Sequence, residues 1–392
     1  MFEYEKYLLK ENPFPVNAAI DPTDPDPRMN GTIFLKDIFE REIQDLYERT
    51  ERGINLIYIS GIEHDKGVGK SALMIHHWRE CLQKPNSTSL YIRLDETDKP
   101  KDICRKIITQ WHNDETLWKA FQTLFLDYCR EQSNPMLQTD AVEYLFEKHP
   151  NLCPDLQLTL YTQIRNSDSI GKQFTSYLQS KTRIDPKNIE PLIQKYLTEP
   201  TTYLDVLNAS KTNTSGVFRD LVKILDLQNY KRHYIFLDQF EDMITGSTRP
   251  GIAKLSLELK NILLASSRKV SFFMTLHPHS EMLLQGMEAK DLTGIAPLDT
   301  IHRVNVMVLD RKGDQAAILA QAYMEYYRTQ EPPYPTYPLE EDLVHFLCYL
   351  EVGNIRALLQ HLYNCIEYGS MKELEEITLK YALENPQEIL GR

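Results

Sequence analysis

The stretch that decides the fold is residues 61–73, which read GIEHDKGVGKSAL. It follows the apolar run Ile54–Ser60, which is typical of a buried parallel strand, and it precedes a segment of helical composition. A phosphate-binding loop, G-x-x-x-x-G-K-[ST], lies between a strand and a helix because amides, a lysine and a hydroxyl converge there on phosphate and Mg²⁺. His64 replaces the first glycine of that pattern, so we expect an extended entrance to the loop. The candidate nucleotide-binding residues are Gly67, Val68, Gly69, Lys70, Ser71 and Ala72.

A second motif lies far along the chain, where the apolar run YIFLD ends at Asp238. An acid at the tip of a buried strand can place a carboxylate beside a Mg²⁺ ion held by Ser71, as phosphoryl-transfer sites require. Each motif alone has a plain alternative, a glycine-rich turn before a helix or a core strand that ends in a solvated acid. Both motifs in this order favour an ATP site in which Ser71 and Asp238 hold Mg²⁺.

Hydrolysis also needs a carboxylate that deprotonates the attacking water. Many ATPases place it directly after the Mg²⁺ aspartate, but here that position is Gln239, which cannot accept a proton. Glu241 fits a D-x-x-E spacing and is the preferred candidate, with Asp242 as the neighbouring alternative. The competing interpretation is a slow or inactive hydrolase that uses ATP as a structural switch.

The rest of the chain is organised around these motifs. Prolines in residues 12–30 exclude regular helix there, and spacings of three and four predict an amphipathic helix over 33–53 that Gly53 ends. Further strands are expected at 89–95, within 233–243, at 270–276 and at 304–309, with a helix at 252–267. The sequence therefore predicts an extended arm (1–30), an α/β nucleotide-binding domain (31–98 and 231–312), a helical insertion (99–230) and a C-terminal helical lid (313–392), in which PPYPTYP at 332–338 forms a stiff loop.

Composition narrows the class of protein. The 392 residues carry a formal charge of -12, which disfavours a chain that coats nucleic acid through Lys and Arg alone. The six cysteines are scattered without C-x-x-C spacing, so neither a zinc site nor a disulfide framework is indicated. The N-terminus lacks the pattern of a secretory leader, and no segment has the apolar length of a membrane span, so we expect a cytoplasmic protein without a membrane partner.

Together the segments GVGKS, FLDQFED, MTLHPHS, IHRVNVMVL and GNIRALLQ resemble AAA+ ATPases, P-loop proteins with a parallel sheet. The resemblance is to the origin-recognition/Cdc6-like branch and to the ExeA-like, transposition-type branch, and it covers most of 1–98 and 231–370. The opening YLLKENPFP is also similar to the start of ExeA-like proteins. DQFED is similar to the Mg²⁺ strand of STAND signalling NTPases as well.

The resemblance implies roles for four further residues. His277, or with less support Thr275, corresponds to the polar sensor at the end of a strand. Arg356 in GNIR corresponds to the lid arginine that contacts the γ-phosphate, and Arg303 corresponds to the arginine finger that completes a neighbouring subunit's site. A solvated residue at the start of a strand is the plain alternative for Arg303.

The resemblance also implies function. It implies an ATP-binding and ATP-hydrolysing protein that uses Mg²⁺, forms a homo-oligomer with ATP at subunit interfaces, and acts as a switch or loader with DNA or a DNA-bound protein. The alternative is a STAND-like signalling or defence switch that acts through protein partners with little turnover. The modest cationic stretches at 99–106 and 180–188 are interpreted as solvated faces, and a binding module with a decayed site is the third possibility.

Overall fold

The computed structural model describes residues 4–17, 19–61, 66–131, 170–198, 202–209, 212–245, 269–276, 301–310 and 314–390, and single positions between 251 and 263. At its centre is a five-stranded sheet of order β2-β3-β4-β1-β5 in which every pairing is parallel. This confirms the predicted α/β fold. The strands are β1 Leu56–Gly61, β2 Ser87–Arg93, β3 Arg232–Asp238, β4 Val270–Leu276 and β5 Ile301–Val306.

Strand register brings the sequence motifs to one edge of the sheet. Ser60 lies opposite Leu276, and Leu237 lies opposite Met274, so β1, β3 and β4 end together. The order β4-β1-β5 puts β1, which precedes the loop, inside the sheet. Ligands of open parallel sheets bind at this carboxyl edge. The predicted bounds of β5 are wrong by three residues, because pairing with β1 already begins at Ile301.

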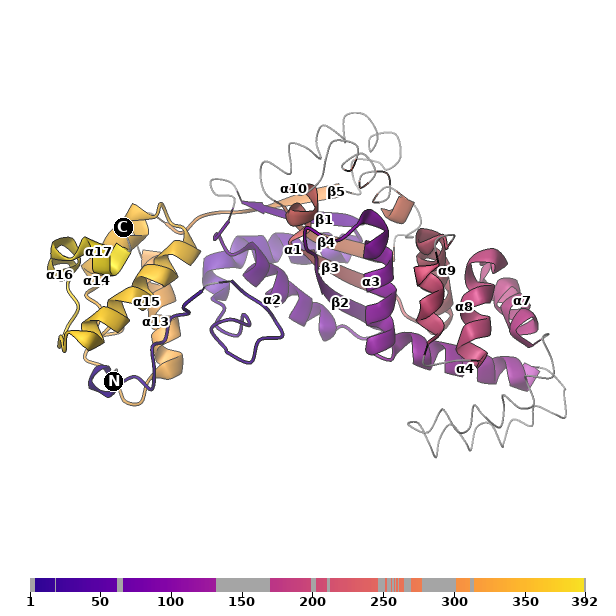
Figure 1. The fold of residues 1–392 in the computed structure, drawn as a ribbon, viewed down its shortest axis with the longest axis horizontal. Helices are drawn as coiled ribbons and strands as arrows, with labels where there is room; N and C mark the ends of the chain where they lie inside the picture. Colours follow the sequence, from indigo (N-terminus) through magenta and orange to yellow (C-terminus); the bar gives the residue numbers. More distant parts are fainter. Residues whose placement is uncertain are drawn as a thin grey trace.

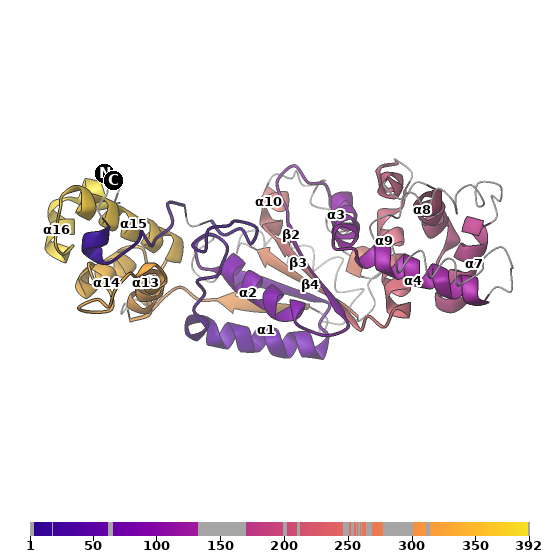
Figure 2. The same ribbon diagram turned by 90° about the horizontal axis from the view of Figure 1, so that it is seen from below.

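Helices cover both faces of the sheet, as Figure 2 shows. On one face α1 (Glu40–Arg52) and α2 (Lys70–Leu82) pack on alternate strand residues, including Ile57, Ile59 and Phe236. On the other face α3 (Pro100–Asn113) and α9 (Thr214–Leu227) meet in a stacked Trp111–Phe218 pair, with 5.6 Å between ring centroids. The alternation of burial follows from the period of two along each strand.

The predicted helix over 33–53 begins later than expected. A 3₁₀ turn, η2 (Lys36–Phe39), precedes α1, and Leu35 is extended with ψ 102°. Gly53 ends α1 in the left-handed conformation at φ 71°, as predicted. The apolar side chains before η2 thus belong to an extended segment that packs against α2, and spacing alone could not distinguish the two conformations.

Every described element between β2 and β3 is a helix. Besides α3 and α9, these are α4 (Thr116–Glu131), α7 (Ile170–Thr182), α8 (Pro186–Thr198) and the 3₁₀ turn η4 (Tyr203–Asn208). Their buried residues form one continuous core with a face of the sheet. Figure 1 shows α7, α8 and α4 projecting to the side away from the C-terminal helices.

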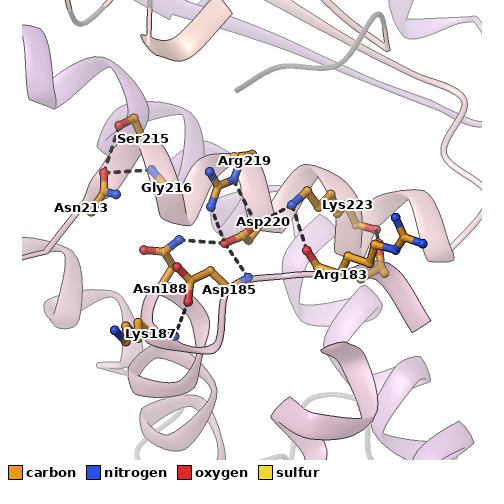
Figure 3. A network of polar contacts seen from close by, with 11 residues as sticks. Arg183, Asp185, Lys187, Asn188, Asn213, Ser215, Gly216, Arg219, Asp220 and Lys223 are labelled. Carbon is orange, nitrogen blue, oxygen red and sulfur yellow. Dashed lines mark hydrogen bonds and ion pairs between the residues drawn. The ribbon is translucent and has the colours of Figure 1, made fainter. Parts of the chain in front are cut away.

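A buried aspartate joins α9 to the turn before α8. Asp220, which has no exposed surface, accepts hydrogen bonds from the Asn188 side chain at 2.8 Å and from the Asp185 main-chain N–H at 3.2 Å. Lys223 and Arg219 complete its shell, as Figure 3 shows. Burial opposes ionisation, but these donors outweigh it and lower the pKa of Asp220. The network therefore fixes the packing of these helices.

The C-terminal helices form a separate core that includes the start of the chain. Tyr7, Leu9 and Phe14 are fully buried among them, and a short 3₁₀ helix, η1 (Glu5–Tyr7), lies within this stretch. The start of the predicted N-terminal arm therefore packs within this core, and the N and C marks of Figure 2 lie beside these helices, here called the lid. The lid helices are α13 (Asp314–Tyr327), α14 (Glu341–Leu350), α15 (Ile355–Met371), α16 (Leu379–Glu384) and α17 (Pro386–Leu390).

Three further predictions concern the cysteines, the helix at 252–267 and membrane-spanning segments. Cys81, Cys104, Cys348 and Cys365 are buried free thiols. The parts of the predicted 252–267 helix that are described are helical. Across the described ranges, no helix has both the length and the hydropathy needed to cross a bilayer.

Candidate nucleotide-binding site

The phosphate loop has the backbone that its glycines predict. Gly67 and Gly69 have φ of 89° and 96°, values that favour glycine, and α2 begins directly afterwards at Lys70. Val68 is fully buried beneath the loop and anchors it to the sheet, whereas Ser71 is half-buried at the helix start. Residues 62–65, which include His64 and most of the unusual entrance, lie outside the described residues. The N-terminal amides of α2 and its dipole favour an anion at this position.

Asp238 lies where the sequence placed it, at the end of β3 beside the loop. The Ser71 hydroxyl donates to its Oδ1 at 3.1 Å, and only 1% of the residue is exposed. These two oxygens fit the way Mg²⁺ is held in nucleotide sites, by one or two protein ligands together with phosphate oxygens and water. The described residues contain no cluster of three or more His, Cys, Asp or Glu suited to a metal.

Tyr91 is a site residue that the sequence did not reveal. Its hydroxyl donates to Oδ2 of Asp238 at 2.5 Å from the neighbouring strand β2. Burial and the Asp238 carboxylate raise the pKa of Tyr91 well above its usual value, so the hydroxyl keeps its proton and remains a donor. The only signal was its place in a strand, four residues after the start of β2, and its contact with Asp238 depends on β2 pairing with β3.

Thr275, the sequence's less supported candidate for the sensor, lies beside both acids of the site. Its hydroxyl lies 3.0 Å from Oδ1 of Asp238 and 3.0 Å from Oε2 of Glu241. It also accepts the main-chain N–H of Gln239 at 2.8 Å. His277 lies outside the described residues. Thr275, the alternative for the sensor, is thus the residue that contacts both acids.

Glu241 is brought to the site by the turn after β3. Gln239 has a left-handed φ of 58°, and the short helix α10 (Phe240–Thr245) then turns Glu241 back toward Thr275. Burial raises the pKa of Glu241 to about 7, although the positive charge of Lys70 opposes the shift. A carboxyl group with this pKa changes protonation near neutral pH, as a general base requires.

Gln239 and Asp242 occupy other places. The Gln239 side chain accepts a hydrogen bond from Arg93 at 2.8 Å, and Arg93 also pairs with Asp21 of the N-terminal segment at 3.2 Å. Asp242 lines the same cavity as Glu241 but lacks its contact with Thr275. The contact with Thr275 therefore distinguishes Glu241 from Asp242 as the candidate base.

The lid contacts the loop through the GNIR motif. The main-chain N–H of Arg356 donates to the carbonyl of Gly67 at 3.1 Å, and the Asn354 side chain donates to the carbonyl of Lys66 at 2.9 Å. Asn354 also caps α15 by accepting the N–H of Ala357. The Arg356 side chain is exposed and lines the cavity beside the loop.

One cavity joins the loop to an apolar chamber. Its polar end contains Lys70, Ser71, Glu241 and Arg356. Its other end is mostly apolar but includes Arg28, and the sequence did not predict this part because its residues come from two segments more than 270 positions apart. The apolar lining consists of Ile20, Ile33, Phe34, Leu35, Ile38 and Phe39 from the N-terminal segment and Leu319, Tyr323, Ile355 and Leu359 from the lid.

Arg303 lies apart from this cavity. It is in the interior of β5, opposite Tyr58 of β1, and is half-buried on an edge strand. The preceding residue, His302, bonds Asp45 of α1 at 3.0 Å on the other face of the sheet. Arg303 therefore does not line the nucleotide-binding cavity of its own chain.

Comparisons with known proteins give the following. No family model matches the chain, and no curated protein matches it. Among solved structures, a Walker-type ATPase of Pyrococcus abyssi is similar with a TM-score of 0.40 and 17% identity, covering 86% of this chain and 70% of that one. Drosophila ORC bound to DNA is similar with a TM-score of 0.40 and 12% identity, covering 88% of this chain, which spans 59% of that one.

Proposed function

We propose that the chain binds ATP with Mg²⁺ in this cavity and hydrolyses it. The observation that carries the proposal is the contact series from Ser71 through Asp238 and Thr275 to Glu241, at the N-terminus of α2. Lys70, the α2 amides and Arg356 would hold the phosphates, and the apolar chamber would take the base. Ser71 and Asp238 would hold Mg²⁺, which supplies charge neutralisation on the β- and γ-phosphates.

The chain's own groups account for activation of water. A Thr275 hydroxyl has one proton and can donate it to Asp238 or to Glu241, but not to both. Glu241 is close to half protonated at neutral pH and can itself donate to Thr275 when it carries a proton. When it is ionised, its Oε atoms can accept a proton from water at the loop. Glu241 is therefore the proposed base, and Thr275 links its protonation to the Asp238 carboxylate.

At the level of the whole protein we propose an AAA+ ATPase of the origin-recognition/Cdc6-like or ExeA-like kind. In this proposal it is a homo-oligomer with ATP at subunit interfaces, where Arg303 of one subunit completes the site of the next. It would act as a nucleotide-driven switch or loader in DNA transactions. The hydrogen bonds from the lid to Lys66 and Gly67 support a coupling between nucleotide and lid position.

A STAND-like switch with little turnover is the second candidate. Gln239 at the position after Asp238 favours it, since its side chain cannot act as a base and is bonded to Arg93. In this case the nucleotide would stay bound and set the conformation seen by a protein partner.

Steady-state ATP hydrolysis separates these candidates. We expect the wild type to turn over ATP, Glu241→Gln to lose turnover while still binding ATP, and Asp242→Asn to retain it as the matched control. Co-purified ADP with no turnover in the wild type would instead support the switch. Equal turnover of wild type and Glu241→Gln would reject Glu241 as the base.

A further inference from the structure

The wall of the apolar chamber nearest α2 is the segment 30–35, here called the base wall. Ile33, Phe34 and Leu35 from this segment line the cavity. Within the described residues, the main-chain N–H and C=O groups of Ile33 and Phe34 have no hydrogen-bond partner. Both residues are half-buried, so these groups are open to a ligand, and the main-chain bond of the base wall lies at its start, where the N–H of Asn30 donates to the carbonyl of Asp26 at 3.0 Å.

The base wall is also held from behind by Arg79, in the last turn of α2. Nη1 of Arg79 donates to the carbonyl of Gly31 at 2.9 Å, and Nη2 donates to the carbonyl of Asn30 at 2.9 Å. The planar guanidinium therefore clamps two successive carbonyls, and charge-assisted bonds of this kind are stronger than neutral ones. No carboxylate pairs with Arg79 within the described residues, so its charge is directed at the base wall.

Two more residues on the same face of α2 support the segment. A Cβ placed on Gly31 would lie 3.4 Å from Cγ2 of Ile75, so the main chain rests directly on that side chain. The ring of His76 stacks on Phe34, with 4.5 Å between centroids and 15° between planes. Ile75 and His76 precede Arg79 by four and three residues, so all three project from neighbouring positions on α2.

The other end of the same helix carries the phosphate site. Lys70 is the first residue of α2, and Arg79 follows nine residues later, about 13.5 Å along the axis. A single rigid helix therefore sets the spacing between the phosphate loop and the base wall.

We propose that Arg79 is a positioning residue for the nucleobase, acting through the main chain of the base wall. This inference rests on the proposed function, because it assumes that the chamber takes the base of a nucleotide. Arg79 does not contact the base in this proposal. It preorganises the main-chain N–H and C=O groups of Ile33 and Phe34, which can then pair with the edge of a purine.

The test compares a ligand that has a base with one that lacks it. We expect Arg79→Met to raise the dissociation constant for ATP about tenfold, equal to about 1.4 kcal/mol, and to change that for tripolyphosphate by less than about twofold. The dissociation constant of Arg79→Lys for ATP should lie between those of the wild type and Arg79→Met, because a point charge cannot clamp both carbonyls. Arg52→Met, in the last turn of α1 and 62% exposed, is the matched control and should bind both ligands as the wild type does.

A second measurement keeps the inference testable if the chain binds no nucleotide. Hydrogen exchange of the unliganded protein should be faster at Thr32, whose main-chain N–H donates to Oδ1 of Asn30, in Arg79→Met than in the wild type or Arg52→Met. Unchanged exchange there would overturn the inference, as would equal losses of ATP and tripolyphosphate affinity. A wild type that binds neither ligand would reject the proposed function, and exchange alone would then decide the role of Arg79.

Discussion

Among single residues, Asp238 has a side chain that is held by four hydrogen bonds. Its carboxylate accepts bonds from Ser71, Tyr91, Thr275 and the main-chain N–H of Gln239. These donors come from α2, from the strands β2 and β4 and from the turn after β3. The carboxylate is thus oriented before any metal arrives, which reduces the cost of forming the metal site.

Tyr91→Phe tests this orientation. Loss of the hydroxyl should raise the Mg²⁺ concentration needed for half-maximal turnover by about tenfold, the lower end of the effect seen when groups that orient metal ligands are removed. A titration of turnover with Mg²⁺ at saturating ATP measures it. Tyr47→Phe, on the exposed part of α1, is the control. A Tyr91→Phe variant with the wild-type Mg²⁺ dependence would show that Oδ2 needs no donor.

Glu241 makes turnover depend on pH. Its pKa of about 7 means that the base becomes available as pH rises through neutrality, so turnover should increase about tenfold from pH 6 to pH 8 and then level. Because the folded-state pKa lies above the ordinary value of 4.5, stability should fall as pH rises between these values. Glu241→Gln should remove this loss of stability. A flat turnover profile across the same range would contradict the assignment.

At the scale of single residues, the sequence pointed to those candidate site residues that belong to a local motif. Lys70, Ser71, Asp238 and Glu241 follow from spacing, because the phosphate loop and the D-x-x-E run are local. Thr275 was the less supported alternative to His277, which lies outside the described residues. Tyr91 could not be found, because its contact depends on which strand lies beside β3.

At the scale of elements, the phosphate loop and the start of α15 fit closely. A Cβ on Gly67 would lie 2.2 Å from Oδ1 of Asn354 and 2.9 Å from Cβ of Arg356. Asn354 cannot move freely, because it caps α15 and bonds Lys66. The lid and the loop are therefore in direct steric contact.

Gly67→Ala should separate the two elements. The new methyl group meets Asn354, and a φ of 89° is strained for alanine, so we expect ATP affinity to fall at least about tenfold. Isothermal titration with ATP and Mg²⁺ measures the change. Gly171→Ala, on α7, serves as a steric control, because its new methyl group meets the end of the Gln194 side chain on α8 rather than the cavity. Wild-type affinity in Gly67→Ala would mean that the loop does not need this contact.

The order of elements was largely predictable, while their bounds were less so. β-branched runs and helical periodicity identified the strands and the helices between β2 and β3. The misplaced start of β5 and the late start of α1 have tertiary causes. Pairing with β1 draws Ile301 into β5, and packing against α2 keeps Ile33 to Leu35 extended.

At the scale of the whole molecule, the N-terminal segment joins the lid to the sheet domain. Tyr7, Leu9 and Phe14 are buried in the lid core, whereas Asp21 pairs with Arg93 at the end of β2. The same segment then forms the base wall beside α2. In Figure 1 it runs from the lid to the sheet domain. No local pattern in a proline-rich stretch predicts such long-range contacts.

Tyr7→Ala tests how far the lid depends on this segment. The ring is fully buried and its hydroxyl donates to the carbonyl of Leu374 at 2.9 Å. We expect a loss of about 3–5 kcal/mol in the free energy of unfolding of the lid. Urea unfolding followed by the tyrosine signal measures it. Tyr349→Ala, where 68% of the residue is exposed, should cost less than about 0.5 kcal/mol, and equal effects of the two changes would contradict the packing.

The central claim is that the cavity between the loop, the lid and the N-terminal segment is an ATP site. Equilibrium binding of ATP with Mg²⁺ to the wild type, Lys70→Ala and Lys84→Ala tests it most directly, since Lys84 lies beyond the far end of α2 and pairs with Glu51. We expect the wild type and Lys84→Ala to bind equally and Lys70→Ala to show no measurable binding. Wild-type affinity in Lys70→Ala, or no binding by the wild type, would contradict the claim.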